Sequence, residues 1–139
     1  MSVRARYLWL WPWLAAVVLA AGSCSASYEV EFHVTLGDGI QAPPGTNIAF
    51  VVAHGQPLAE AISRSSVPIE AGKRQYLGKG SACCAPEPTV SLLAFVDRDG
   101  DNVMDADEPS GVDPRNPITL TDTQHAFRSD IVIAAAQAK

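Results

Sequence analysis

Residues 28–36 read YEVEFHVTL, and this stretch decides the fold class. Apolar side chains at Tyr28 and at every second position through Leu36 alternate with polar ones. Successive side chains of a strand point to opposite faces, so a period of two predicts a strand with one buried face and one wet face. Residues 37–39 (GDG) are a cluster of turn residues and end the strand.

Two further stretches are typical of core strands. Residues 47–53 (NIAFVVA) and 89–96 (TVSLLAFV) are short, apolar and partly β-branched. Residues 58–63 fit either one helical turn or a strand. Shorter strands are expected at residues 67–69, 75–77, 118–120 and 129–135. Gly and Pro residues separate these runs, and no long stretch has the helical period of 3.6.

This pattern predicts an all-β fold, a single antiparallel β-sandwich of about six or seven strands after an N-terminal signal segment. The chain has 139 residues, of which 47% are hydrophobic. That length suits one domain, because single domains most often have roughly 100 to 150 residues. We therefore assign residues 1–23 to a signal peptide of lipoprotein type and residues 24–139 to one β-sandwich domain.

The N-terminal segment has the parts of a secretory signal. Arg4 and Arg6 make its start positive, and residues 7–21 (YLWLWPWLAAVVLAA) form an apolar run of 15 before two small residues. A transmembrane span needs about 20 apolar residues, and this run is shorter and broken by Pro12. The sequence therefore favours an exported protein over one with a retained membrane span.

Residues 21–24 (AGSC) are similar to a bacterial lipobox, in which small residues precede a cysteine that is lipidated and becomes the mature N-terminus. Lipoboxes usually have Leu three places before the cysteine, where this chain has Ala21. Ordinary cleavage after Gly22 or Ala26 therefore remains an alternative. If Cys24 is lipidated, the protein is bound to a membrane of the cell envelope, on the periplasmic or outer-membrane face.

The charge of the chain excludes one class of partner. The net charge is −5, and removal of Arg4 and Arg6 leaves 8 basic against 15 acidic side chains, or −7. Nucleic-acid phosphates require clustered Lys and Arg, so we do not expect a nucleic-acid partner. An acidic surface suits a cation.

Cys83 and Cys84 are adjacent, in a chain whose expected compartment preserves disulfides. Neighbouring Cα atoms lie about 3.8 Å apart, which is shorter than the usual disulfide span, so a bond between them would close a strained ring. The pair could form a redox-sensitive turn or a thiol site for copper(I) or zinc. We favour a strained structural disulfide or two packed thiols, because no His or third Cys is near in sequence.

Residues 97–108 (DRDGDNVMDADE) are the one motif that carries chemistry. Six of the fifteen acidic residues of the chain lie in these twelve positions. With Asp97 as the first loop position, the third, fifth, seventh, ninth and twelfth positions hold Asp99, Asp101, Val103 (through its carbonyl), Asp105 and Glu108. This is the ligand spacing of an EF-hand-type calcium loop, and it predicts a structural Ca²⁺. The alternative is a solvated acidic turn between two strands.

Two positions test the match to such a loop. Asn102 occupies the sixth position, which prefers Gly for its positive φ, and Asn is the best substitute there. Met104 occupies the eighth position, where we expect a side chain that packs inward. The flanks read as strands and not as helices, so we expect a loop that rigidifies the domain and no calcium-driven opening. We also expect Asp97→Ala or Glu108→Ala to destabilise the domain only when calcium is present.

The stretch LLAFVDRDGDNVMDADEPSGV, residues 92–112, resembles small exported β-sandwich domains of transthyretin-like or carboxypeptidase-regulatory type. In these domains a strand ends in an Asp/Asn/Gly-rich loop that an E-P-x-G-like segment follows, here residues 108–111. The resemblance implies a binding or structural module, and it assigns no activity.

No catalytic site is predicted. His33, His54 and His125 are far apart in sequence, and no nucleophile motif such as G-x-S-x-G occurs. We therefore expect no enzyme but a lipid-anchored envelope module with a calcium-braced β-sandwich, which binds or scaffolds an envelope protein or glycan. The alternative is a periplasmic protein that handles thiols or metals through Cys83 and Cys84.

Overall fold

The computed structural model describes residues 26–55, 60–83 and 85–135. The predicted signal peptide, Cys24 and Cys84 lie outside these residues. The described part of the chain holds no helix long and apolar enough to cross a bilayer. Its strands are β1 (Ser27–Leu36), β2 (Asn47–His54), β3 (Glu60–Pro68), β4 (Gln75–Cys83), β5 (Thr89–Asp97), β6 (Ser110–Val112), β7 (Ile118–Thr119) and β8 (Phe127–Ile133).

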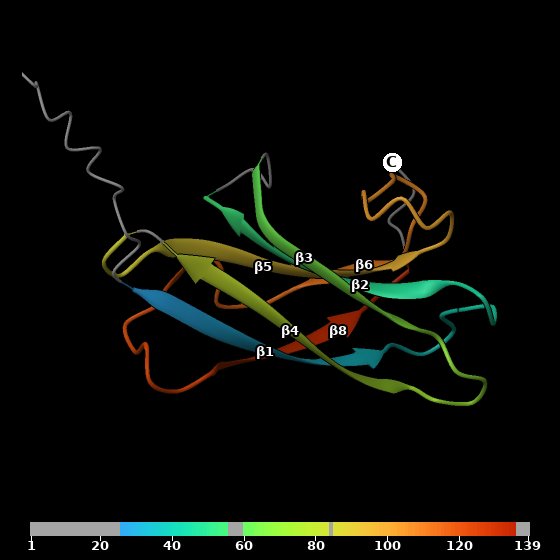
Figure 1. The fold of residues 1–139 in the computed structure, drawn as a ribbon. Helices are drawn as coiled ribbons and strands as arrows, with labels where there is room; N and C mark the ends of the chain where they lie inside the picture. Colours follow the sequence, from blue (N-terminus) through green and yellow to red (C-terminus); the bar gives the residue numbers. More distant parts are fainter. Residues whose placement is uncertain (1–25, 56–59, 84, 136–139) are drawn as a thin grey trace, which may run out of the picture.

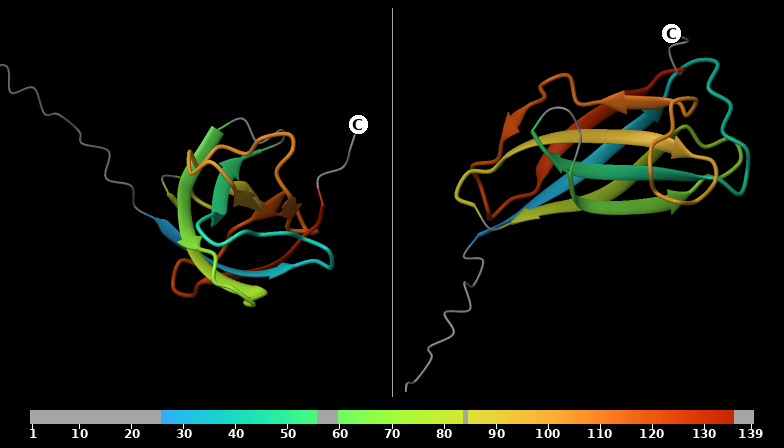
Figure 2. Two further views of the ribbon diagram at one scale, coloured as in Figure 1. Left: turned by 90° about the vertical axis from the view of Figure 1, so that its right-hand side faces the viewer. Right: turned by 90° about the horizontal axis from the view of Figure 1, so that it is seen from above.

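The strands form two layers, which confirms the predicted all-β fold (Figure 1). The small sheet has the order β4-β1-β8, and the large sheet has the order β3-β2-β5-β6, with β7 also paired to β5. The end-on view in Figure 2 shows the two layers wrapped around a common interior. The architecture is thus a β-sandwich.

Most strand predictions are confirmed, and the differences lie in strand length and direction. The segment from Glu60 onward is a strand and not a helical turn, and β4 extends well beyond the expected residues 75–77. The pairing of β1 with β8 is parallel, whereas we expected an antiparallel sandwich throughout. The reason is the connection over residues 120–126, which crosses between the layers and starts β8 at the same end as β1 (Figure 1).

The apolar face of β1 packs on the inward face of the large sheet. Val30 and Phe32 are fully buried, as are Ile48 and Val52 of β2. The rings of Phe32 and Phe50 lie 5.4 Å apart between centroids. Gly78 of β4 faces the Phe50 ring, and a Cβ at that position would overlap it. The small residue thus lets a large one fill the core.

The large sheet is buried on its outward face as well. Val51 of β2 and the Leu93 and Phe95 side chains of β5 keep at most 7% of their surface exposed there. This explains why the sequences of β2 and β5 are continuous apolar runs and do not alternate, because a strand covered on both faces needs apolar residues at every position.

The two sheets meet along two edges, which we call seams, and polar groups connect the sheets at both of them. At one seam the Ser65 hydroxyl donates to the Lys79 carbonyl at 2.6 Å, and the Ser81 amide donates to the Ser63 hydroxyl at 3.0 Å. The other seam joins β6 to β8.

At the β6–β8 seam the Ala134 amide donates to the Ser110 carbonyl at 3.1 Å. The next residue, Gly111, lies so close to β8 that a Cβ would overlap the Val132 carbonyl oxygen. This contact gives a physical reason for Gly at the end of the E-P-x-G-like segment.

We predict that Gly111→Ala lowers the free energy of unfolding by about 2 kcal/mol or more, because the added methyl group pushes β6 away from β8. Chemical denaturation measures this change. Ser66→Ala, on the exposed side of β3, is the control and should change stability by less than about 0.5 kcal/mol. Equal effects of the two substitutions would contradict a tight β6–β8 contact.

Candidate metal centre

The acidic loop connects β5 to β6 on the outward side of the large sheet (Figure 1). It starts at Asp97, the last residue of β5. The Val96 amide donates to the Pro109 carbonyl at 2.9 Å and closes the base of the loop. This closure brings Asp97 and Glu108, the first and twelfth loop positions, next to each other.

The Asp97 carboxylate is fully buried. One of its oxygens, Oδ1, accepts the Gly100 amide at 2.7 Å, and Oδ2 accepts the Asn102 amide at 3.1 Å. Each oxygen keeps a further lone pair for another partner. The two hydrogen bonds coil the backbone around the carboxylate, so the loop sequence itself fixes the orientation of this side chain.

The Glu108 carboxylate closes the loop from its other end. It is 4% exposed, and its Oε1 accepts the Arg98 amide at 2.7 Å while Oε2 accepts the Asp105 amide at 3.0 Å. Four backbone amides therefore hold the two buried carboxylates of the loop. Such donors stabilise negative charge and replace part of the lost hydration.

Hydrogen bonds between residues two positions apart shape the exposed part of the loop. The Asp101 amide donates to Asp99 Oδ1 at 3.2 Å, and the Val103 amide donates to Asp101 Oδ1 at 2.6 Å. Asn102 has a φ of 59°, which confirms the left-handed backbone predicted for the sixth position. Asn tolerates this conformation better than other residues with a Cβ, so the substitution for Gly is accommodated.

Three predicted ligands meet. Asp97, Asp99 and Glu108 each place one carboxylate oxygen so that all three oxygens lie within 4.8 Å of one another. The described residues contain no other such group of His, Cys, Asp or Glu. Asp101 and Asp105 lie outside the group, so their roles as ligands stay predictions, as does that of the Val103 carbonyl. Three oxygens at this separation are a partial coordination shell for a hard cation.

One expectation about the loop is wrong, and the hydrogen bonds argue against a second. Met104 is 41% exposed and belongs to neither apolar cluster of the described residues, so it does not pack inward. Moreover, Asp97 and Glu108 each accept two backbone amides, so their replacement by Ala removes hydrogen bonds whether or not a metal is present.

The remaining predicted positions do not converge. Cys83 is exposed at the end of β4, and Cys84 lies beyond the described residues, so their disulfide stays a prediction. His33 lies on β1, His54 ends β2, and His125 precedes β8, where its Nδ1 is 3.0 Å from Asp122 Oδ2. The three imidazoles therefore form no shared site.

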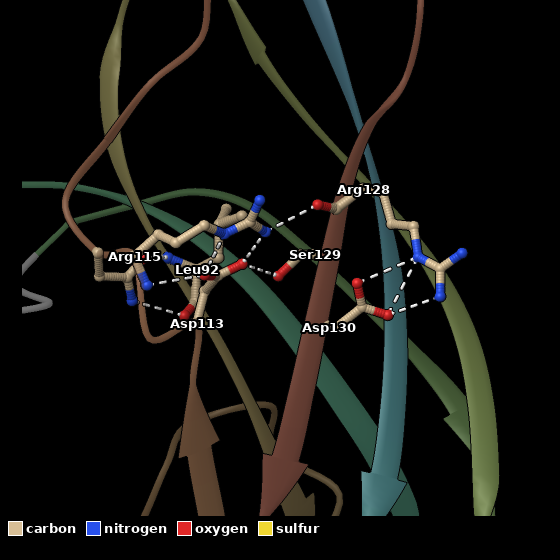
Figure 3. Close-up of polar contacts among 7 residues, drawn as sticks. Leu92, Asp113, Arg115, Arg128, Ser129 and Asp130 are labelled. Atoms are coloured by element: carbon tan, nitrogen blue, oxygen red, sulfur yellow. Dashed lines mark hydrogen bonds and ion pairs between the residues drawn. The ribbon is translucent and has the colours of Figure 1, made fainter.

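Sequence reasoning missed a buried polar network at the β6–β8 seam (Figure 3). The side chain of Asp113 is fully buried and accepts the Arg115 guanidinium through both of its oxygens, at 2.9 and 2.7 Å. It also accepts the Ser129 hydroxyl of β8 at 2.8 Å. Arg115 in turn donates to the Arg128 carbonyl at 2.9 Å. The network joins the end of β6 to β8 by charge-assisted hydrogen bonds.

Asn116 completes the large sheet between β6 and β7. Its side-chain Oδ1 accepts the Leu92 amide at 2.9 Å, and its Nδ2 donates to the Leu92 carbonyl at 2.9 Å. An amide side chain thus replaces a backbone partner at a gap in the sheet. The sequence feature that could have pointed to these residues is DPRNP, residues 113–117, in which polar side chains with both donors and acceptors alternate with prolines.

Burial acts to raise the pKa of Asp113, but the hydrogen bonds from Arg115 and Ser129 outweigh it, so the pKa lies below the usual value. A carboxyl with a lowered folded-state pKa stabilises the fold at pH values above its unfolded pKa of about 3.9. That stability is lost as the pH falls through the folded-state pKa.

We predict that Asp113→Asn lowers the free energy of unfolding at neutral pH by about 1–3 kcal/mol, because it breaks a buried charged pair. The difference from the parent protein should shrink as the pH falls below about 4, where Asp113 is protonated in the unfolded chain. Denaturation at a series of pH values measures it. Asp38→Asn, an exposed partner of Arg74, is the control. Parallel pH curves for the parent and Asp113→Asn would refute this role.

Comparison with known proteins adds no relative: no family, curated protein or solved structure matches this chain. Its function is therefore inferred from its own residues. The grouped carboxylates of Asp97, Asp99 and Glu108 are the feature with the clearest chemistry.

Proposed function

We propose that this chain is an exported, lipid-anchored domain of the cell envelope, whose β-sandwich is braced by Ca²⁺ in the loop over residues 97–108. It acts as a binding or scaffold module for an envelope protein or glycan, and it is not an enzyme. The observation that carries the proposal is the meeting of Asp97, Asp99 and Glu108 oxygens within 4.8 Å.

Charge repulsion supports a bound cation. Like charges a few ångströms apart repel strongly where burial reduces solvent screening, and two of these three carboxylates are buried. The backbone amides around Asp97 and Glu108 offset part of this repulsion, and a divalent cation would remove the rest. The predicted ligands are all oxygens, which suit Ca²⁺ or Mg²⁺ better than zinc or copper.

The length and flexibility of the loop favour Ca²⁺ over Mg²⁺. Ca²⁺ accepts six to eight oxygen ligands in variable geometry, whereas Mg²⁺ demands a near-ideal octahedron. Carboxylates of the first, third, fifth, ninth and twelfth loop positions, with the Val103 carbonyl, could supply the larger set. Affinity should be ~10⁻⁴ to 10⁻³ M, which is typical of extracellular modules.

The position of the loop supports a structural role for the cation. Asp97 ends β5, and Glu108 stands two residues before Ser110, where β6 starts. An ion bound by both carboxylates would tie the two strands together next to the seam with β8. No helix adjoins the loop in the described residues, so there is no element that calcium would open.

The cellular address of the proposal comes from the sequence. The signal-like segment over residues 1–23 and Cys24 support export and lipidation, and the resemblance to transthyretin-like or carboxypeptidase-regulatory domains supports a binding module. The net charge of −5 agrees with a cation ligand and with the absence of a nucleic-acid partner.

We predict that millimolar calcium raises the thermal unfolding midpoint of the protein beginning at Ser25 by several degrees relative to excess chelator. At the expected Kd, millimolar calcium is about 1 to 10 times Kd, which adds roughly 0.4 to 1.4 kcal/mol of stability. The informative variant is Asp99→Asn, because its amide oxygen can still accept the Asp101 amide while the charge is lost. It should remove most of the calcium shift and leave stability in chelator nearly unchanged.

Asp107→Asn is the matched control, since Asp107 is exposed and is not among the predicted ligands. It should retain the full calcium shift. No shift in the parent protein, or equal loss in both variants, would reduce residues 97–108 to an acidic turn. A larger shift with magnesium than with calcium would reject calcium as the ion.

A further inference from the structure

The outward face of the small sheet is open. Its outward-pointing residues alternate with the buried residues of β1, β4 and β8, and no described element covers them. Leu77 of β4 and Val132 of β8 are 61% and 62% exposed, the largest values among the large apolar side chains of the described residues. Together with His33 and Asp130 they line a hollow of about 300 Å³.

The register of the small sheet arranges the charges of this face in rows. In one row Glu31 of β1 lies between Lys79 of β4 and Arg128 of β8. In the next row, two residues further along β1, His33 lies between Leu77 and Asp130. The sign of the charge therefore reverses from one row to the next on β8, from Arg128 to Asp130.

The same side chains are paired within the chain. Arg128 and Asp130 make an ion pair of 2.8 Å, and Figure 3 shows both turned away from the side that holds Ser129. His33 Nε2 and Glu31 Oε1 lie 3.6 Å apart. Groups already held in position lose less conformational freedom when a further partner binds.

We propose that this face is a self-association surface, on which a second copy of the chain stacks with its strands antiparallel to the first. The proposed twofold axis runs perpendicular to the strands and lies between the two rows. It places each row of one copy opposite the other row of the second copy. Arg128 then faces Asp130 of the second copy, and Glu31 faces its His33. Because a twofold contact is self-complementary, every such pair forms twice.

The apolar residues of the face fit the same arrangement. The twofold places Leu77 over Lys79 of the second copy, whose aliphatic stem can cover it while the ammonium group stays in water. Because sheets are twisted, residues of two stacked sheets stay opposite each other only near the twofold axis. The two rows nearest the axis are the rows that contain the charge pairs. Complementary charge thus selects a second copy as the occupant of this face.

The association must be weak. The face offers 13 outward residues on three short strands, fewer than the roughly 20 to 30 residues a side of a standard interface. The net charge of −5 also drives copies apart at long range. Association therefore depends on local pairs and on high local concentration. It requires neither calcium nor the lipid anchor.

The test measures the self-association constant of the exported protein by sedimentation equilibrium at up to millimolar concentration, in excess chelator so that calcium plays no part. Arg128→Asp and Asp130→Arg each place like charges opposite each other across the twofold. Each should weaken association by about tenfold or more, since opposed like charges are strongly unfavourable at an interface.

The double variant, which carries both changes, exchanges the two charges and regenerates every pair. It should return the association constant to within roughly threefold of the parent value. Arg98→Asp, in the loop that connects β5 to β6 on the large sheet, is the control for the changed net charge and should have a small effect. Thermal unfolding of each variant verifies that the fold is retained.

A parent protein that stays monomeric over the whole concentration range would overturn the proposal. A double variant that associates no more tightly than the single variants would also overturn it. In that case the restored opposite charges at positions 128 and 130 would have had no effect on the association constant. An association constant lowered equally by Arg98→Asp would show that net charge causes the effect, and it would reject this face as the interface. None of these results bears on the calcium proposal.

Discussion

The approach of β6 to β8 is the constraint on which the rest of this structure depends. Gly111 allows it, because any larger residue would overlap the Val132 carbonyl oxygen. The contact brings Ser110 into hydrogen-bonding distance of Ala134 and joins the two sheets along one side. Glu108 belongs to the same segment, so the seam that closes the sandwich also places one end of the acidic loop.

Three buried carboxylates lie at or near this seam, and each is compensated differently. Asp113 is paired with a guanidinium and a hydroxyl, which satisfies it without a ligand. Asp97 and Glu108 receive only backbone amides. A charge held by neutral donors still attracts a cation, whereas a charge held by arginine is neutralised. This difference separates the proposed metal centre from the purely structural network.

The two faces of the sandwich have different chemistry. The large sheet buries apolar residues on both of its faces, so it forms the rigid centre of the domain. The small sheet leaves a polar face open, where Arg128 and Asp130 place opposite charges two residues apart along β8. A calcium-braced loop on one layer and an interaction surface on the other would let a small domain hold its shape and make a contact at the same time.

The sequence alone determined the local features. The period of two in residues 28–36, the continuous apolar runs of β2 and β5, and the spacing of carboxylates from Asp97 to Glu108 all depend on neighbouring residues, so each could be recognised without the fold. The left-handed backbone at Asn102 followed in the same way, because an intrinsic preference of one residue type decides it.

Only the tertiary structure decided what depends on strands far apart in the chain. The parallel pairing of β1 with β8 is set by the path of a connection between layers, and a strand pattern does not contain that direction. Asp113 and Ser129 meet only because β6 and β8 do. Met104 is exposed and belongs to neither apolar cluster of the described residues. Side-chain periodicity reports which face is buried, whereas the identity of the neighbour on that face is fixed by long-range packing.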